Sequence, residues 1–248
     1  MTTIYDLANP KRFEAFAKTL TPFTAAATAA LFVAGLYFAL FHSPADYQQG
    51  ETVRIMYVHV PAAWMAMMCY TSMAVASAAG FIWKHPLADV AAKTTAPIGA
   101  AFTFLALFTG SLWGKPMWGA WWAWDARLTS VLILFFMYLG YIALWNAIED
   151  KTRAAKIAAI ACLVGFINVP IIKFSVDWWN SLHQPASVFK EGGPSIDGSM
   201  LTPLFLMGLA YTLLYVTLLF IAMRAELAER RIQRLEQAAR APSGAVIS

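Results

Sequence analysis

Hydrophobic positions along this chain come in six long runs, and shorter polar segments separate them. The runs cover roughly residues 21–42, 60–83, 94–113, 128–148, 155–174 and 202–223. Each run reaches the length of about 20 residues that a helix needs to cross the hydrocarbon core of a bilayer. Only helices and closed barrels satisfy their backbone groups there. The pattern therefore predicts an all-α integral membrane protein, a bundle of six transmembrane helices.

The composition agrees with a membrane protein and argues against a soluble domain and a nucleic-acid-binding protein. Hydrophobic residues make up 60% of the chain and charged residues 13%, whereas soluble domains carry about 25% charged residues. The net charge of +4 does not indicate nucleic-acid binding, because the basic residues lie in short loops and the tail. Cys69 and Cys162 lie inside apolar runs without a C-x-x-C pattern, so we expect small core residues and no redox pair.

The distribution of basic residues predicts the orientation. Six spans place both termini on one side, and the positive-inside rule assigns the more basic side to the cytoplasm. Thirteen basic residues lie on the predicted inner side: Lys11, Arg12, Lys18, Lys84, Lys93, Lys151, Arg153, Lys156, Arg224, Arg230, Arg231, Arg234 and Arg240. Five lie on the outer side: Arg54, Lys115, Arg127, Lys173 and Lys190. The prediction is an N-in, C-in topology.

This topology leaves three segments at the outer face, residues 43–59, 113–128 and 175–201. The tail, 224–248, is predicted to be cytoplasmic, with a charged, amphipathic helical extension as far as Arg240. The first twenty residues are largely polar, and the run after them is long enough to span, so we expect no cleavable signal peptide. We find no internal repeat, and we expect 1–248 to form one six-span domain.

The second outer segment contains an unusual density of tryptophan, and we call residues 113–127 the tryptophan segment. Five of the chain's 10 tryptophans lie in it: Trp113, Trp118, Trp121, Trp122 and Trp124. The segment also carries Lys115, Asp125 and Arg127. Indoles offer flat apolar faces and one N–H donor each, so such a platform beside polar groups suits a large planar ligand with an anionic edge. The alternative is an aromatic belt at the membrane interface.

The local structure of the tryptophan segment has two interpretations. On a helix, Trp118, Trp121, Trp122 and Asp125 would share one face, because their spacing follows i, i+3, i+4, i+7. Pro116 and Gly119 make a loop at the start of the segment equally compatible with the sequence.

The four histidines divide according to the predicted topology. His85 lies in an inner turn, whereas His42, His59 and His183 lie near the outer face. Pro61 suits the first turn of the second helix, which would hold His59 at the mouth of that helix. Neutral imidazole is a good ligand for iron, and two imidazoles on opposite faces of a porphyrin give a six-coordinate site. The residues favour His59 and His183 as the two ligands, and they do not exclude His42 as one of the two.

The run from Trp113 to Ser130 resembles the WWD motif of the haem-handling proteins of cytochrome c biogenesis. Over essentially the whole chain, the six spans, the motif and one histidine in each flanking outer segment are similar to the CcmC family, the haem exporter C proteins of the bacterial cytochrome c maturation system I. The resemblance implies a non-enzymatic protein that binds haem b at the periplasmic face of the inner membrane.

The resemblance also implies roles for individual residues. It implies that His59 and His183 are the axial ligands of the iron and that Arg54 and Arg127 lie near the haem propionates. The porphyrin would be cradled by the tryptophan segment, with Trp113, Gly114, Trp118, Trp121, Trp122, Trp124 and Asp125 as haem-binding residues. Asp125 is a candidate to orient Arg127 or, alternatively, to cap the fourth helix.

The same resemblance implies partners that no spacing or periodicity could indicate. They are the periplasmic haem chaperone CcmE, the CcmA/CcmB ATP-binding-cassette pair and the small protein CcmD. The chain has no G-x-x-x-x-G-K-[ST] phosphate loop, so we expect any ATP hydrolysis to come from a partner. Two other functions compete: an electron-transfer subunit of the membrane b-type cytochrome kind, and a permease for another hydrophobic solute.

Overall fold

The computed structural model describes residues 8–183, 187–188 and 190–240, and within them it confirms the all-α, six-span architecture. The N-terminal and C-terminal ends of the predicted domain, and residues 184–186 and 189 of the third outer segment, lie outside the described part. The helices are α2 (Pro10–Tyr37), which continues as the π-helical turn η1 (Phe38–His42), the 3₁₀ turn η2 (Glu51–Ile55), α3 (Met56–Trp83), α4 (Ala88–Trp118), α5 (Ala126–Ala147), α6 (Lys151–Gly165), α7 (Asn168–Trp178) and α8 (Gly198–Arg240).

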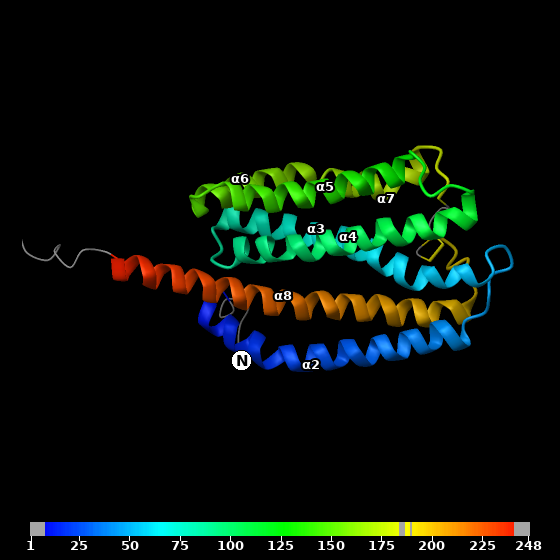
Figure 1. Cartoon of the computed structure of the whole chain (residues 1–248), viewed down its shortest axis with the longest axis horizontal. Coiled ribbons are helices and arrows are strands. Elements are labelled where there is room, and N and C mark those ends of the chain that lie inside the picture. Colours follow the sequence, from blue (N-terminus) through cyan, green and yellow to red (C-terminus); the bar gives the residue numbers. More distant parts are fainter. Residues whose placement is uncertain (1–7, 184–186, 189, 241–248) are drawn as a thin grey trace, which may run out of the picture.

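The helices lie side by side in an elongated bundle (Figure 1). The pair α3 and α4 occupies the middle, with α5, α6 and α7 on one side and α8 and α2 on the other. At one end, which we call the loop end, the segments 43–50, 119–125 and the described part of 179–197 gather. At the other, the turn end, only residues 84–87 and 148–150 connect helices.

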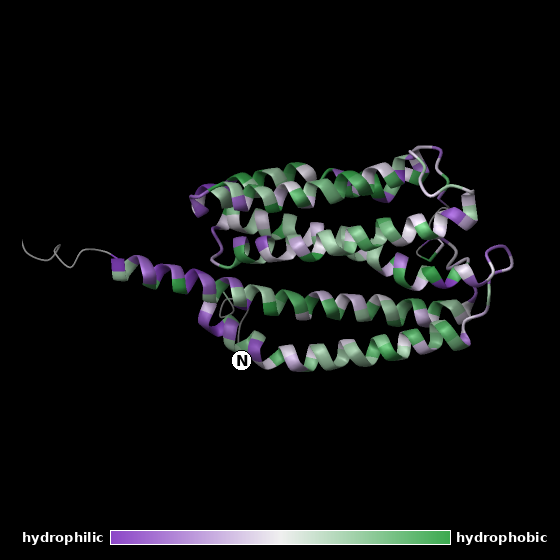
Figure 2. Ribbon diagram, viewed as in Figure 1, coloured by the Kyte–Doolittle hydropathy of each residue, from purple (hydrophilic) through white to green (hydrophobic). Residues whose placement is uncertain are grey.

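Three of the predicted spans end at different positions in the structure. The helix α4 extends to Trp118, five residues beyond the predicted end of its span. The predicted span 155–174 is two helices, because α6 ends at Gly165 and α7 begins at Asn168. The predicted tail is helical as far as Arg240, as expected, and this part belongs to α8, which runs without a break over 43 residues. Figure 2 shows this tail as a hydrophilic rod that projects beyond the hydrophobic body of the bundle.

The core lies where α3, α4 and α5 meet and is built from small residues and tyrosines. The hydroxyl of Tyr138 on α5 donates to the carbonyl of Ala66 on α3, at 2.7 Å. Tyr70 meets Tyr138 edge to face, with ring centroids 5.2 Å apart. Ala62 and Ala96 have no exposed surface. Small side chains allow helix backbones to approach closely in membranes, and the hydroxyl finds a backbone acceptor in the absence of water. These contacts join α3 to α5, and both helices line the cavity described below.

Candidate functional site

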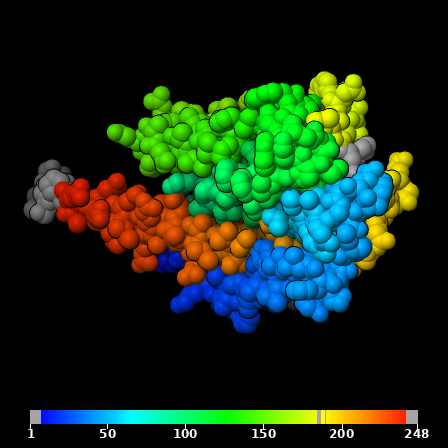
Figure 3. Space-filling model, turned by 45° about the vertical axis from the view of Figure 1, so that its right-hand side comes forward, coloured from blue at the N-terminus to red at the C-terminus, as the bar shows by residue number. Residues whose placement is uncertain are grey.

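The cavity at the loop end has a volume of about 340 Å³, within the range of ligand pockets. We call it the loop-end cavity. In Figure 3 the three segments of the loop end come forward together, the blue to cyan segment 43–59 beside the green tryptophan segment and the yellow third segment. Most of the walls are apolar, with Val60, Leu107 and Val131 among them. Eight polar or charged side chains border it: Gln49, His59, Ser111, Arg127, Lys173, Asp177, His183 and Ser187.

His59 reaches the cavity from the first turn of α3. The prediction that Pro61 opens this helix is wrong, because α3 begins at Met56 and follows the turn η2 directly. His59 Nδ1 lies 3.0 Å from the carbonyl oxygen of Ala106 and 3.2 Å from Thr109 Oγ1, both on α4. Because a carbonyl only accepts hydrogen bonds, Nδ1 carries the proton and Nε2 keeps its lone pair.

The close approach of His59 to α4 depends on Gly110. A Cβ at that position would lie 2.9 Å from His59 Cε1 and 3.3 Å from Nδ1. Such contacts are too short for carbon and nitrogen atoms that are not bonded, so any larger side chain would displace the imidazole. Nothing in the sequence marks this glycine as part of the site.

His183 reaches the same cavity from the segment after α7, and Asp125 holds it there. The carboxylate Oδ2 of Asp125 accepts from Ser181 Oγ at 2.6 Å and lies 3.3 Å from His183 Nδ1. The other oxygen, Oδ1, accepts from the backbone N–H of Leu128 at 2.7 Å and so caps α5. The capping role predicted for Asp125 is confirmed. With Nδ1 directed at a carboxylate, His183 also keeps Nε2 as an acceptor.

The protonation states of this pair follow from burial and hydrogen bonding. Burial alone would raise the pKa of Asp125, but hydrogen bonds from Ser181, Leu128 N–H and His183 outweigh it and hold that pKa below its usual value. Burial lowers the pKa of His183 by more than the hydrogen bond to Asp125 raises it. At neutral pH the pair is therefore a carboxylate and a neutral imidazole, the form that binds metals.

The five tryptophans of the tryptophan segment divide into two groups. Trp113, Trp118 and Trp122 line the cavity, whereas Trp121 and Trp124 do not and are 56% and 77% exposed. Of the two interpretations of this segment, the one with a single helical face is wrong, because Gly119 takes a φ of 75° and ends α4 after Trp118. The chain then runs without helix to Asp125.

Each cavity histidine meets one tryptophan of α4 edge to face. The ring centroids lie 5.7 Å apart for His59 and Trp113 and 4.9 Å apart for His183 and Trp118. Trp113 is fixed at its other edge, because its Nε1 donates to Gln49 Oε1 at 2.8 Å. Gly114 allows the Trp118 ring to fold back on the helix, since a Cβ there would lie 2.9 Å from the ring.

The two arginines singled out from the sequence lie in different surroundings. Arg127 lines the cavity and is held by Ser175 Oγ at 3.1 Å and by the carbonyl of Lys173 at 3.3 Å. Arg54 does not line it and pairs with Glu51 at 2.5 Å and with the carbonyl of Ala39. Lys173 is a second cation at the cavity that the sequence analysis had not singled out.

The remaining two histidines lie away from the loop-end cavity. His42 ends η1, is exposed, and packs its ring near Tyr37 and Phe38. His85 lies in the turn between α3 and α4 at the turn end, where its Nδ1 accepts from Leu87 N–H at 3.3 Å. The structure thus brings His59 and His183 to one cavity and leaves out His42, which the sequence had left open.

Comparison with known proteins gives one consistent result. The family CcmC, described as heme exporter protein C, matches residues 3–238. The chain is 61% identical to heme exporter protein C of Bradyrhizobium diazoefficiens over 234 residues, which cover 94% of this chain and 89% of that protein. It is 47% identical to heme exporter protein C of Escherichia coli K12 over 222 residues, 90% and 89% of the two chains.

A further relative comes from a plant. A ccmC-like mitochondrial protein of cytochrome c biosynthesis from Marchantia polymorpha is 54% identical over 171 residues, which cover 69% of this chain and 72% of that protein. The family match over residues 3–238 includes all six spans and the tryptophan segment. This six-span membrane protein therefore belongs to the CcmC family.

Proposed function

We propose that this chain takes part in haem export for cytochrome c maturation by binding haem b between His59 and His183. The main support for the proposal is that the protein holds both imidazoles in the same way. Each has its Nδ1 bound to an acceptor of the protein, Ala106 O or Asp125 Oδ2, and each lines the same cavity. A metal-ligating histidine usually has this arrangement, in which a second acceptor fixes the tautomer and directs the free nitrogen at the metal.

The walls of the cavity suit the rest of a porphyrin. Trp113, Trp118 and Trp122 supply aromatic surface, and apolar residues of α3, α4 and α5 supply most of the remainder. Trp122 Nε1 is buried and has no hydrogen-bond partner among the described residues, so it has a donor available for an anionic group. Arg127 and Lys173 offer cations for propionates at the same cavity. Arg54 would need to leave Glu51 to join them.

Membership of the family and the predicted orientation support the following cellular setting. In this proposal the loop end faces the periplasm, the chain spans the inner membrane, and haem passes to the chaperone CcmE. The ATP-binding-cassette pair CcmA/CcmB and the small protein CcmD act beside it. Both histidines lie at the loop end of the bundle, His59 in the first turn of α3 and His183 after the end of α7. This position suits delivery to an external acceptor better than electron transfer through the membrane.

The hand-off to the chaperone is the experiment that tests this function. Purified haem-loaded protein, mixed with apo-chaperone in the absence of ATP, is expected to transfer its haem, because the chain itself has no nucleotide-binding loop. Stopped-flow absorbance follows the transfer. Failure to bind haem at all would favour the permease, and reversible redox cycling with a quinone, without transfer, would favour the cytochrome.

Asp125 is expected to act on haem through His183. In Asp125→Asn the amide oxygen can still cap α5, since asparagine is as good an N-cap as aspartate, but the negative charge beside His183 Nδ1 is lost. Removal of such an outer partner typically weakens metal binding by about 10–100-fold. We expect a fall of that order in haem affinity, measured by titration of apo-protein, with little change in the thermal midpoint.

The chain offers a matched control for this substitution. Asp150 caps α6 in the same way, accepting from the N–H groups of Thr152 and Arg153 at 2.9 and 3.3 Å, and it lies at the turn end. Asp150→Asn should leave haem affinity unchanged. If both variants lose haem to the same extent, helix capping and not the orientation of His183 is responsible.

A further inference from the structure

A second cavity lies at the turn end, on the opposite side of the bundle from His59 and His183. Its volume is about 740 Å³, and we call it the turn-end cavity. It opens between the turn that joins α3 to α4, the start of α6 and the tail portion of α8. Nothing in the proposed haem hand-off uses this cavity.

Basic side chains from three different elements border the turn-end cavity. They are Lys84 and His85 of the α3–α4 turn, Lys151 and Lys156 of α6, and Arg230 and Arg234 of α8. Three acidic residues also border it: Asp89, Glu149 and Asp150. Asp89 is paired with Arg230 at 2.7 Å, and one oxygen of Asp150 caps α6. Within the described part of the chain, four of the bordering cations have no ion-pair partner: Lys84, Lys151, Lys156 and Arg234. Of the bordering carboxylates in that part, Glu149 and Asp150 have none either, so the unpaired charge at the cavity is mainly positive.

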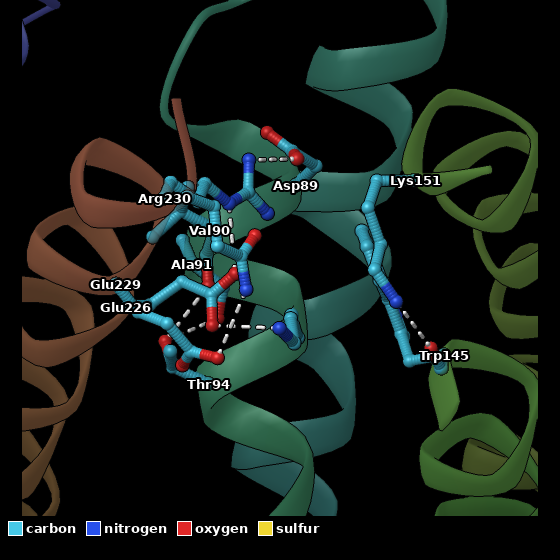
Figure 4. A network of polar contacts seen from close by, with 11 residues as sticks. Asp89, Val90, Ala91, Thr94, Trp145, Lys151, Glu226, Glu229 and Arg230 are labelled. Carbon is cyan, nitrogen blue, oxygen red and sulfur yellow. Dashed lines mark hydrogen bonds and ion pairs between the residues drawn. The ribbon is translucent and has the colours of Figure 1, made fainter. Parts of the chain in front are cut away.

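A network of charged residues fixes Arg230 at the cavity (Figure 4). Its Nη1 pairs with Asp89 of α4, and its Nε pairs with Glu226 at 2.7 Å. Glu226 in turn accepts from Lys93 at 2.6 Å. The ring of Trp145 lies 5.3 Å from Lys93 Nζ and 5.9 Å from the guanidinium carbon of Arg230. Several contacts therefore hold this arginine in place before any ligand arrives.

One donor of this network is unused. Arg230 Nη2 is buried and has no hydrogen-bond partner among the described residues. A buried guanidinium nitrogen without a partner is costly, and it calls for a water, an ion or a ligand group to accept from it. The arginine borders the cavity, and arginine is well suited to bind the oxygens of a phosphate group.

We propose that the turn-end cavity binds the phosphate headgroup of an anionic phospholipid. The surface beside the cavity is apolar: Phe81 lines it, and Phe81, Ile82 and Trp83 at the end of α3 are all exposed. Tryptophan at a helix end is typical of the headgroup layer. Acyl chains can therefore lie along α3 while the headgroup meets the basic residues. Basic pockets between membrane helices on the cytoplasmic side are known to take such lipids, and the positive-inside rule predicts that side for this end.

The test measures lipid binding to the full chain in detergent by native mass spectrometry. Phosphatidylglycerol is titrated into delipidated protein, with phosphatidylcholine as the zwitterionic comparison. The test variant is Lys84→Gln/Lys156→Gln/Arg234→Gln, and these three side chains are exposed, so the fold should be retained. Each lost charge is expected to weaken phosphatidylglycerol binding about fivefold, or on the order of a hundredfold for the three.

The control variant is Lys11→Gln/Lys18→Gln/Arg231→Gln, which removes the same charge from exposed positions of α2 and α8 outside the cavity. It is expected to bind phosphatidylglycerol like the unaltered protein, and circular dichroism checks that both variants are folded. Equal losses in the two variants would show general attraction to the basic end and overturn the proposal. Equal binding of phosphatidylcholine, or displacement of the lipid by inorganic phosphate alone, would also overturn it.

Discussion

Protein in which His59 and His183 are both replaced by alanine is expected to keep almost none of its haem through purification. Each single replacement should weaken or shift the Soret band, because the iron then loses one of its two protein ligands. The loss should exceed the roughly 10–100-fold typical of an outer partner such as Asp125. The measurement is the absorption spectrum of the protein purified in detergent, with haem quantified against protein.

The other two histidines are the controls for this experiment. His85→Ala changes a side chain at the turn end, and His42→Ala changes an exposed ring outside the loop-end cavity. Neither should alter the spectrum. A shift in His42→Ala together with a normal spectrum in His59→Ala would show that the ligand pair is wrong, even though the two proposed ligands share a cavity.

Exogenous imidazole separates ligation from structural damage. In His59→Gly or His183→Gly, the space of the missing ring at the cavity can admit free imidazole, which supplies the same ligand atom. Recovery of the Soret band on its addition would identify the lost interaction as iron coordination. A band that stays absent in both variants, while circular dichroism shows an intact fold, would count against ligation by these residues.

The spans were predictable from the sequence because a membrane helix needs only length and continuous apolarity. The break between α6 and α7 did have a local signal, because Gly165 and Asn168 lie at it and Pro170 follows in the first turn of α7. A proline cannot donate the helical hydrogen bond to the carbonyl four residues before it, so it favours a helix boundary there, but the continuous apolarity of the run concealed this signal. The end of α4 was only half predictable. Gly119 marked a possible turn, but Pro116 wrongly suggested that the helix ends earlier, and the structure keeps it inside α4.

The residues of the candidate site could be predicted where the type of side chain alone indicates the function. Imidazoles and clustered indoles pointed to His59, His183 and the tryptophan segment, but the sequence could not show which indoles face the cavity. It also could not indicate Ala106, whose contribution is a backbone carbonyl common to every residue. The pairing of Asp125 with His183 joins positions 58 residues apart, and only the packing of α5 against α7 brings them together.

Gly110→Ala is expected to reduce haem binding although position 110 supplies no ligand to the metal. The added Cβ would lie 2.9 Å from His59 Cε1, so the ring must move by several tenths of an ångström. The hydrogen bond from Nδ1 to Ala106 opposes that movement. Metal–ligand distances tolerate deviations of only about 0.2 Å. We therefore expect haem affinity to fall by about 10–100-fold, as for loss of an outer partner.

The thermal stability of Gly110→Ala should not fall together with its haem affinity. This difference distinguishes a displaced ligand from a damaged fold. Alanine is favoured over glycine within a helix by up to about 1 kcal/mol, so the α4 backbone itself gains from the change. Gly140→Ala in α5 is the matched control, because a Cβ there meets nothing within 4 Å. It should keep full haem affinity, with a thermal midpoint equal to or above that of the unaltered protein.

A double substitution decides whether Gly110 acts through His59. In a His59→Ala background the ring that the new methyl group would displace is absent, so adding Gly110→Ala should cause little further loss of haem. The two effects would then be strongly non-additive, as expected for residues in contact. Additive losses would mean that the methyl group blocks the cavity itself, because Gly110 also lines it. Unchanged affinity in the single variant would show that α4 can move aside and that His59 is not held as tightly as its contacts indicate.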